Sequence, residues 1–116
     1  MAFSEIELKK IDKLIGGLCD RKTRPDIRDQ LRFEYDIKGH NVHIWEIRPD
    51  YFDPAQETKH GVAKFQYIRS KNRWKLYWMR ADLKWHAYEP DPGQALTDLK
   101  AQIAEVENDP YGAFFG

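Results

Sequence analysis

The chain has one cysteine, no long apolar run and no net charge. Cys19 has no second cysteine to pair with, so the fold does not depend on an oxidising compartment. No apolar segment approaches the ~18 residues that are needed to cross a bilayer. Lys and Arg together number 19, as do Asp and Glu, and this balance argues against a strongly basic nucleic-acid module and against an acidic tail protein.

Catalytic and metal-binding motifs are also missing. There is no glycine-rich phosphate loop and no Gly-x-Ser-x-Gly motif, which excludes serine hydrolases of that type. A zinc site needs three or four converging ligands, and no such spacing relates the cysteine to the four histidines, His40, His43, His60 and His86. We therefore expect no metal and no cofactor, and we expect Cys19 to be a small core residue.

Length and composition fit one folded domain. A chain of 116 residues with 14% aromatic residues is long enough to bury a core and is not typical of disorder. The first ten residues lack the basic start, apolar stretch and cleavage site of a secretory signal. We therefore expect a cytoplasmic protein with a single domain, residues 1–116, that makes no contact with a membrane.

Both ends of the chain carry helix patterns. Ser4 and Glu7 match a capping box, and the apolar residues that follow recur every three or four positions, which predicts a helix that ends before Arg24-Pro25. A second capping pattern begins at Asp91 and predicts a helix that ends at Asp109-Pro110. The second pattern consists of Asp91 as cap, Pro92, Gln94, and an apolar stripe of Leu96, Leu99, Ile103 and Val106.

Between the helices the hydrophobic period changes to two. This alternation predicts strands over 31–37, 42–48, 62–69, 74–80 and 84–88, with a surface loop over 49–61. The other connections are too short for parallel crossovers, so neighbouring strands should pair antiparallel. The predicted fold class is α+β, a five-stranded antiparallel meander with an N-terminal and a C-terminal helix packed on one face. We expect Phe114 and Phe115 in the tail to dock on the body.

Several short segments spread over the chain resemble a known family. They are Arg28-Asp29-Gln30-Leu31-Arg32, Arg48-Pro49, Val62-Ala63-Lys64-Phe65, Leu76-Tyr77-Trp78, Lys84-Trp85-His86, Asp109-Pro110 and Phe114-Phe115-Gly116. In these segments the sequence resembles a family of small bacterial proteins described as a domain of unknown function, DUF3024. Here Phe115 precedes the final glycine, whereas the family has a tryptophan there. The resemblance implies a bacterial, cytoplasmic, stand-alone protein, and it brings no catalytic residue.

The neutral total hides an uneven distribution of charge. Residues 64–84 contain seven Lys and Arg residues and one Asp, a net charge of +6, whereas residues 89–109 carry a net charge of −5. Aromatic residues are interleaved with the basic ones. Single-stranded nucleic-acid binders combine cations for phosphates with aromatic faces for stacking.

The strand period assigns these side chains to two faces. If Trp74, Leu76, Trp78, Trp85 and Ala87 point inward, alternate residues point outward on the face that the helices leave open. The candidate ligand-binding residues are Arg32, Arg48, Lys64, Lys75, Tyr77, Lys84, His86 and Tyr88. The alternative is a solvated sheet face whose cations pair with the acidic second helix.

Three functions remain open. The first is a non-enzymatic binding module whose basic and aromatic face takes nucleic acid or another anionic partner. The second is a protein-interaction or structural subunit that uses Tyr51, Phe52 and the aromatic tail as anchors. The third is an enzyme with a site near His86 and Arg48.

Overall fold

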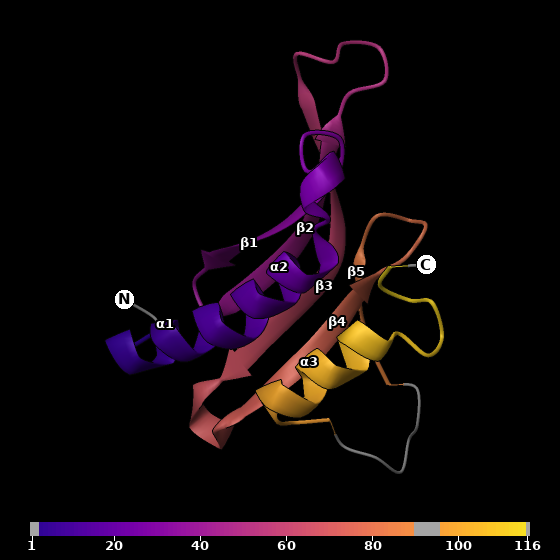
Figure 1. The fold of residues 1–116 in the computed structure, drawn as a ribbon. Helices are drawn as coiled ribbons and strands as arrows, with labels where there is room; N and C mark the ends of the chain where they lie inside the picture. Colours follow the sequence, from indigo (N-terminus) through magenta and orange to yellow (C-terminus); the bar gives the residue numbers. More distant parts are fainter. Residues whose placement is uncertain (1–2, 90–95, 116) are drawn as a thin grey trace.

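A computed structural model describes residues 3–89 and 96–115. A helix over residues 5–22 is followed by a five-stranded antiparallel sheet and by a second helix (Figure 1). The strands pair in chain order, β1-β2-β3-β4-β5. They are β1 (Arg32–Lys38), β2 (Asn41–Pro49), β3 (Glu57–Ile68), β4 (Arg73–Met79) and β5 (Trp85–Ala87). Both helices lie on the same side of the sheet, which confirms the predicted α+β meander.

The N-terminal helix begins with the predicted capping box. Ser4 Oγ accepts the Glu7 N–H at 3.2 Å, and Glu7 Oε1 accepts the Ser4 N–H at 2.8 Å. The helix runs as α1 (Glu5–Ile11), a π-helical segment η1 (Asp12–Gly16) and α2 (Gly17–Lys22). Its apolar stripe is buried on the sheet and contributes Ile11, Ile15 and Leu18 to the core.

The C-terminal helix begins later than the sequence pattern predicts. The predicted cap at Asp91, with Pro92 and Gln94, lies outside the described residues. Helix α3 (Leu99–Asn108) is capped by Asp98, whose carboxylate accepts the Ala101 N–H at 3.2 Å. Leu96 therefore precedes the helix instead of forming its first turn. The three remaining members of the predicted stripe, Leu99, Ile103 and Val106, are all buried.

The tail docks on the body as predicted. Asp109 ends α3 in a left-handed conformation, and its carboxylate accepts the N–H groups of Phe114 and Phe115 at 3.0 and 2.8 Å. Phe114 is buried, and the ring of Phe115 packs edge-on against Phe33 with 5.2 Å between centroids. These contacts join the end of the chain to the helix-covered side of the sheet.

The predicted loop over 49–61 is wrong in its second half. Strand β3 already begins at Glu57 and pairs with β2 as far as Pro49, so the connection is only residues 50–56. This part of the hairpin projects beyond the body of the protein (Figure 1). The first residues of β3, Glu57–His60, are all polar and exposed, so their sequence resembles that of a loop.

The two faces of the sheet follow from the strand register. Side chains directly opposite on neighbouring strands share a face, and Phe65 pairs with Leu76 on the side that carries the core. Trp74 and Trp78 pack against the same core, whereas Lys75 and Tyr77 point to the other side, as predicted. We call this second side the open face, because neither helix covers it (Figure 1).

The predicted orientation of the last strand is wrong. Met79 pairs with Trp85, and Tyr77 pairs with Ala87, so Trp85 and Ala87 belong to the open face and not to the core side. His86 and Tyr88 alternate with them and belong to the helix-covered side. The connection between β4 and β5 has five residues, 80–84, and an odd number keeps odd-numbered residues of both strands on one face.

Gly61 makes room for Trp85 on the open face. A Cβ atom at Gly61 would lie 2.7 Å from Met79 Cε and 2.8 Å from Trp85 Cη2, closer than atoms can approach. The indole therefore lies directly over the backbone of β3.

Among the described residues, no helix is long and apolar enough to cross a membrane.

We predict that Gly61→Val lowers the free energy of unfolding by about 1–3 kcal/mol, because the added methyl groups displace Trp85 and Met79. The matched control is Gly17→Ala, where the nearest atom is the mobile Arg21 Nη1 at 3.2 Å and helix propensity favours alanine. Urea unfolding of both variants measures the difference. A Gly61→Val variant as stable as the wild type would contradict the close packing.

Candidate functional site

The open face presents its side chains in rows across the sheet. One row runs Asp36–His43–Lys64–Tyr77 over β1 to β4, with each residue opposite the next. The row on one side of it contains Asn41, Gln66 and Lys75, and the row on the other contains Trp45, Gly61, Met79 and Trp85. Basic and aromatic side chains of three or four strands thus meet at the centre of this face.

Two lysines flank one tyrosine ring in this centre. Lys64 Nζ lies 4.8 Å and Lys75 Nζ 5.4 Å from the centroid of the Tyr77 ring. The Tyr77 hydroxyl donates to Gln66 Oε1 at 2.7 Å, which holds the ring in position close to both ammonium groups. Within residues 3–89 and 96–115, neither lysine forms an ion pair. Both positive charges are therefore available to an anion.

An aromatic cluster lies beside the lysines. The His43 ring stacks on Trp45 and also approaches Trp85, with 5.7 Å between centroids in each case. The two indoles meet edge to face at 6.1 Å. Asp36 holds this cluster on one side, because its carboxylate accepts the Trp45 Nε1–H at 3.1 Å and lies 3.4 Å from His43 Nδ1. The two tryptophans are half-buried and keep part of their surface exposed.

The aromatic cluster was not among the predicted site residues. His43 and Trp45 alternate along β2 with the core residues Ile44 and Val42, and this spacing already indicates that both lie on the open face. The alternation alone places Trp85 on the core side, whereas the five-residue connection between β4 and β5 puts it on the open face.

Burial holds His43 in its neutral form. Only 9% of the residue is exposed, and this burial lowers the pKa of His43 below its ordinary value of 6.5. The carboxylate of Asp36 opposes the shift, whereas the positive charges of Lys64 and Lys38 add to it. At neutral pH the imidazole is therefore an uncharged ring within the aromatic cluster.

The other predicted residues are engaged elsewhere. Arg32, at the edge of the open face, bonds to Glu34 at 2.9 Å and to Glu57 at 2.5 and 3.0 Å. Arg48 pairs with Glu46, and Lys84 lies exposed in the β4–β5 connection. These contacts leave Lys64, Lys75 and Tyr77 as the predicted residues that the structure brings together on the open face.

His86 and Tyr88, placed outward by the sequence pattern, lie on the helix-covered side. The Tyr88 hydroxyl donates to Glu105 of α3 at 2.5 Å, and its ring packs on Phe114. Burial and Glu105 raise the pKa of the Tyr88 hydroxyl, so it stays protonated. His86 Nε2 lies 2.9 Å from Asp82 Oδ2 and lines a surface cavity of about 590 Å³.

The described lining of this cavity includes Trp78, Arg80 and Tyr111 but not Arg48. The predicted combination of His86 with Arg48 in one enzyme site is therefore not formed there.

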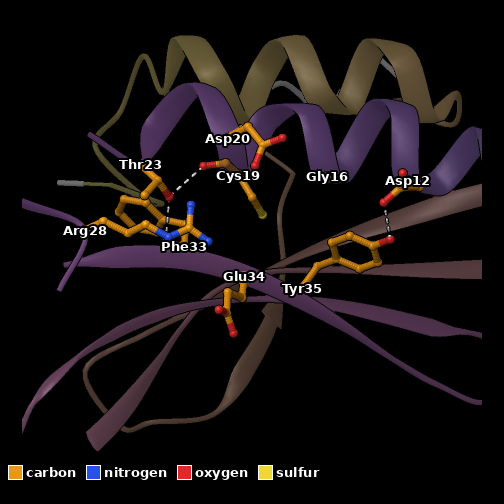
Figure 2. A pocket seen from close by; sticks show the side chains of 9 residues that line it. All are labelled: Asp12, Gly16, Cys19, Asp20, Thr23, Arg28, Phe33, Glu34 and Tyr35. Atoms are coloured by element: carbon orange, nitrogen blue, oxygen red, sulfur yellow. Dashed lines mark hydrogen bonds between the residues drawn. The ribbon is translucent and has the colours of Figure 1, made fainter. Parts of the chain in front are cut away.

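A second cavity, of about 280 Å³, lies between the N-terminal helix and β1 (Figure 2). On one side Asp12 accepts the Tyr35 hydroxyl at 2.8 Å, and on the other Thr23 links Cys19 O to the Phe33 N–H. Cys19 is buried, as expected for a core residue, and burial raises the pKa of its thiol to about 12. A thiol of this kind is not a nucleophile at neutral pH.

Metal-ligating side chains do not converge in the described residues. No group of three or more His, Cys, Asp and Glu side chains there has a geometry that could hold a metal ion. The open face, with its free lysines and its aromatic cluster, is therefore the candidate functional site.

We predict that the free energy of unfolding decreases as the pH falls below 6.5, and that His43→Gln reduces this slope. The folded-state pKa of His43 is lowered, so the unfolded chain takes up the proton first and stability is lost on acidification. Urea unfolding at several pH values measures the slope. The matched control is His60→Gln, at an exposed position of β3. An identical slope for wild type and His43→Gln would refute the assignment.

Comparison with known proteins identifies a family. A family model described as a domain of unknown function, DUF3024, matches residues 3–116. No curated protein and no solved structure matches the chain. The match covers the helices, the sheet and the docked tail alike, and it confirms the resemblance found in the sequence. The chain belongs to the DUF3024 family.

Proposed function

We propose that the open face binds single-stranded nucleic acid. The observation that carries the proposal is the position of Lys64 and Lys75 close to the ring of Tyr77, with no ion-pair partner in the described residues. Two ammonium groups about one aromatic ring match a phosphate backbone whose bases stack on the protein.

The aromatic cluster supports a single strand as the ligand. Unpaired bases expose their faces, and proteins bind them on aromatic side chains displayed by a sheet. Trp45 and Trp85 are half-buried, so they keep their orientation while part of each indole stays accessible. A duplex offers no free base faces to such a surface.

The acidic C-terminal helix does not neutralise this face. Helix α3 lies on the opposite side of the sheet (Figure 1). Its carboxylates Glu105 and Glu107 bond to Tyr88 and to Arg21 of α2. The alternative in which the basic strands pair with the acidic helix therefore finds no support at Lys64 and Lys75. The strands that carry Lys64 and Lys75 belong to a segment, residues 64–84, with a net charge of +6 in a chain whose total charge is zero.

We predict that the protein binds a homopyrimidine DNA oligonucleotide at low salt and that the affinity falls steeply as salt is added. Fluorescence anisotropy of a labelled oligonucleotide measures both. Lys64→Ala with Lys75→Ala should weaken binding and reduce the slope of log affinity against log salt by about 1.4, because each phosphate contact to a single strand contributes about 0.7. Tyr77→Leu should weaken binding about two- to fivefold, because the ring no longer holds the two ammonium groups in place.

The matched control is Lys9→Ala with Lys13→Ala, which removes two exposed lysines from the N-terminal helix on the other side of the sheet. This variant should bind the oligonucleotide almost as tightly as the wild type does. Only the small loss that follows from a less positive net charge is expected. Absence of binding at low salt, or equal losses in both double variants, would refute the proposal.

A further inference from the structure

The tip of the β2–β3 hairpin exposes two aromatic side chains. Tyr51 and Phe52 are each 89% exposed, more than any other large hydrophobic residue of the described chain. Their rings meet edge to face at 5.1 Å. Exposed aromatic pairs of this kind are uncommon on a protein that works alone and mark interaction surfaces.

The tip is held in shape before it meets a partner. The Asp50 N–H donates to Gln56 O, and the Gln56 N–H donates to Asp53 O, each at 2.9 Å. The carboxylate of Asp53 also accepts the Ala55 N–H at 3.2 Å. A preorganised tip loses little conformational entropy on binding.

The charge of the tip is negative. Residues 50–56 contain Asp50 and Asp53 and no Lys or Arg. Two such tips would repel each other, and a surface rich in cations and aromatic rings is their complement. The open face has this composition, with Lys64, Lys75 and Tyr77 at its centre.

A tip cannot reach the open face of its own chain. Strands β2 and β3 are part of the sheet, and they remain paired up to Pro49 and Glu57, so the tip projects away from the body (Figure 1). A second copy has no such constraint. With two open faces turned toward each other, each tip can lie on the face of the other copy, which closes a two-fold dimer.

We infer that the acidic aromatic tip, residues 50–56, docks on the open face of a second copy and occupies the surface proposed for nucleic acid. The two aromatic residues of a tip would bury about 150–250 Å² each, and the tip would cover a similar area of the partner's face. The two contacts of a dimer then bury about 1,200–2,000 Å² in total, the size of a stable interface. The carboxylates stand where phosphates would bind, and the rings where bases would stack. The inference rests on the proposed function only for this competition, because the dimer itself requires no nucleic acid.

Sedimentation equilibrium of the purified full chain, without nucleic acid, tests the dimer. The wild type should be dimeric, and Tyr51→Ser with Phe52→Ser should weaken self-association about tenfold or more, because these rings are the anchors of the contact. The matched control Ile6→Ser changes another exposed apolar residue, 81% exposed on α1, and should remain dimeric. Circular dichroism verifies that each variant is folded. A monomeric wild type, or a tip variant that stays dimeric, would overturn the inference.

Charge reversal tests which surfaces meet. Asp50→Lys with Asp53→Lys makes the tip basic, and Lys64→Glu with Lys75→Glu makes the face acidic, so each variant alone should be monomeric. A mixture of the two should form a heterodimer, because both of its tip–face contacts then join opposite charges. Failure of the mixture to associate, while both variants are folded, would rule out the docking of tip on face.

An oligonucleotide titration separates this inference from the proposed function. Single-stranded DNA should dissociate the wild-type dimer, and the monomeric tip variant should bind it more tightly than the wild type. Binding that leaves the dimer intact overturns the competition and retains the proposed function. A dimer with the predicted mutational pattern, but without DNA binding by either form, overturns the proposed function and retains the docking of tip on face.

Discussion

The packing of both helices onto one side of the sheet is the constraint on which the other features depend. Ile11, Ile15 and Leu18 from the N-terminal helix meet one continuous core with Leu99 and Val106 from the C-terminal helix. Each fully buried side chain of this size contributes about 1.5–3 kcal/mol relative to an exposed one. Because strand side chains alternate, burying Phe65 and Leu76 against the helices forces Lys64, Lys75 and Tyr77 to the opposite side. The core therefore decides which residues a ligand can reach.

Some ionic groups of the protein serve the fold, and others stay available. Arg21 joins the two helices through Glu107, Arg69 joins the end of β3 to Glu7 of α1, and Arg32 is bound by carboxylates of β1 and β3. Lys64 and Lys75 have aromatic neighbours instead of carboxylates in the described chain. A cation that is held against a ring loses little side-chain entropy when it binds an anion. Its charge is not neutralised by a carboxylate, so it remains available to that anion.

The helices and strands could be predicted from the sequence, and so could the sheet face on which most side chains lie, because both depend on local periodicity. The capping box at Ser4, the alternation in β4 and the docking of Phe114 all correspond to short-range patterns. The misplaced features of the sheet depend on pairing between strands. The orientation of Trp85 follows from the five-residue connection before it, and the early start of β3 at Glu57 follows from pairing with polar residues of β2.

The candidate site was predicted in part for the same reason. Lys64, Lys75 and Tyr77 lie in strands with a strong period of two, so their common face could be predicted. The cluster of His43, Trp45 and Trp85 joins residues of two strands that are not neighbours, and it needs Gly61 between them to let Trp85 lie down on the sheet. Neither the contact between the two separate strands nor the role of Gly61 beneath Trp85 has a signature in the local sequence.

The four tryptophans provide the most direct test of the central claim, that the open face is the binding surface. Trp45 and Trp85 lie on the open face, whereas Trp74 and Trp78 pack against the helix-covered core. An NMR titration with single-stranded DNA follows the four indole N–H signals at once. Binding at the open face should shift the signals of Trp45 and Trp85 and leave those of Trp74 and Trp78 unchanged. Shifts confined to Trp74 and Trp78 would contradict it.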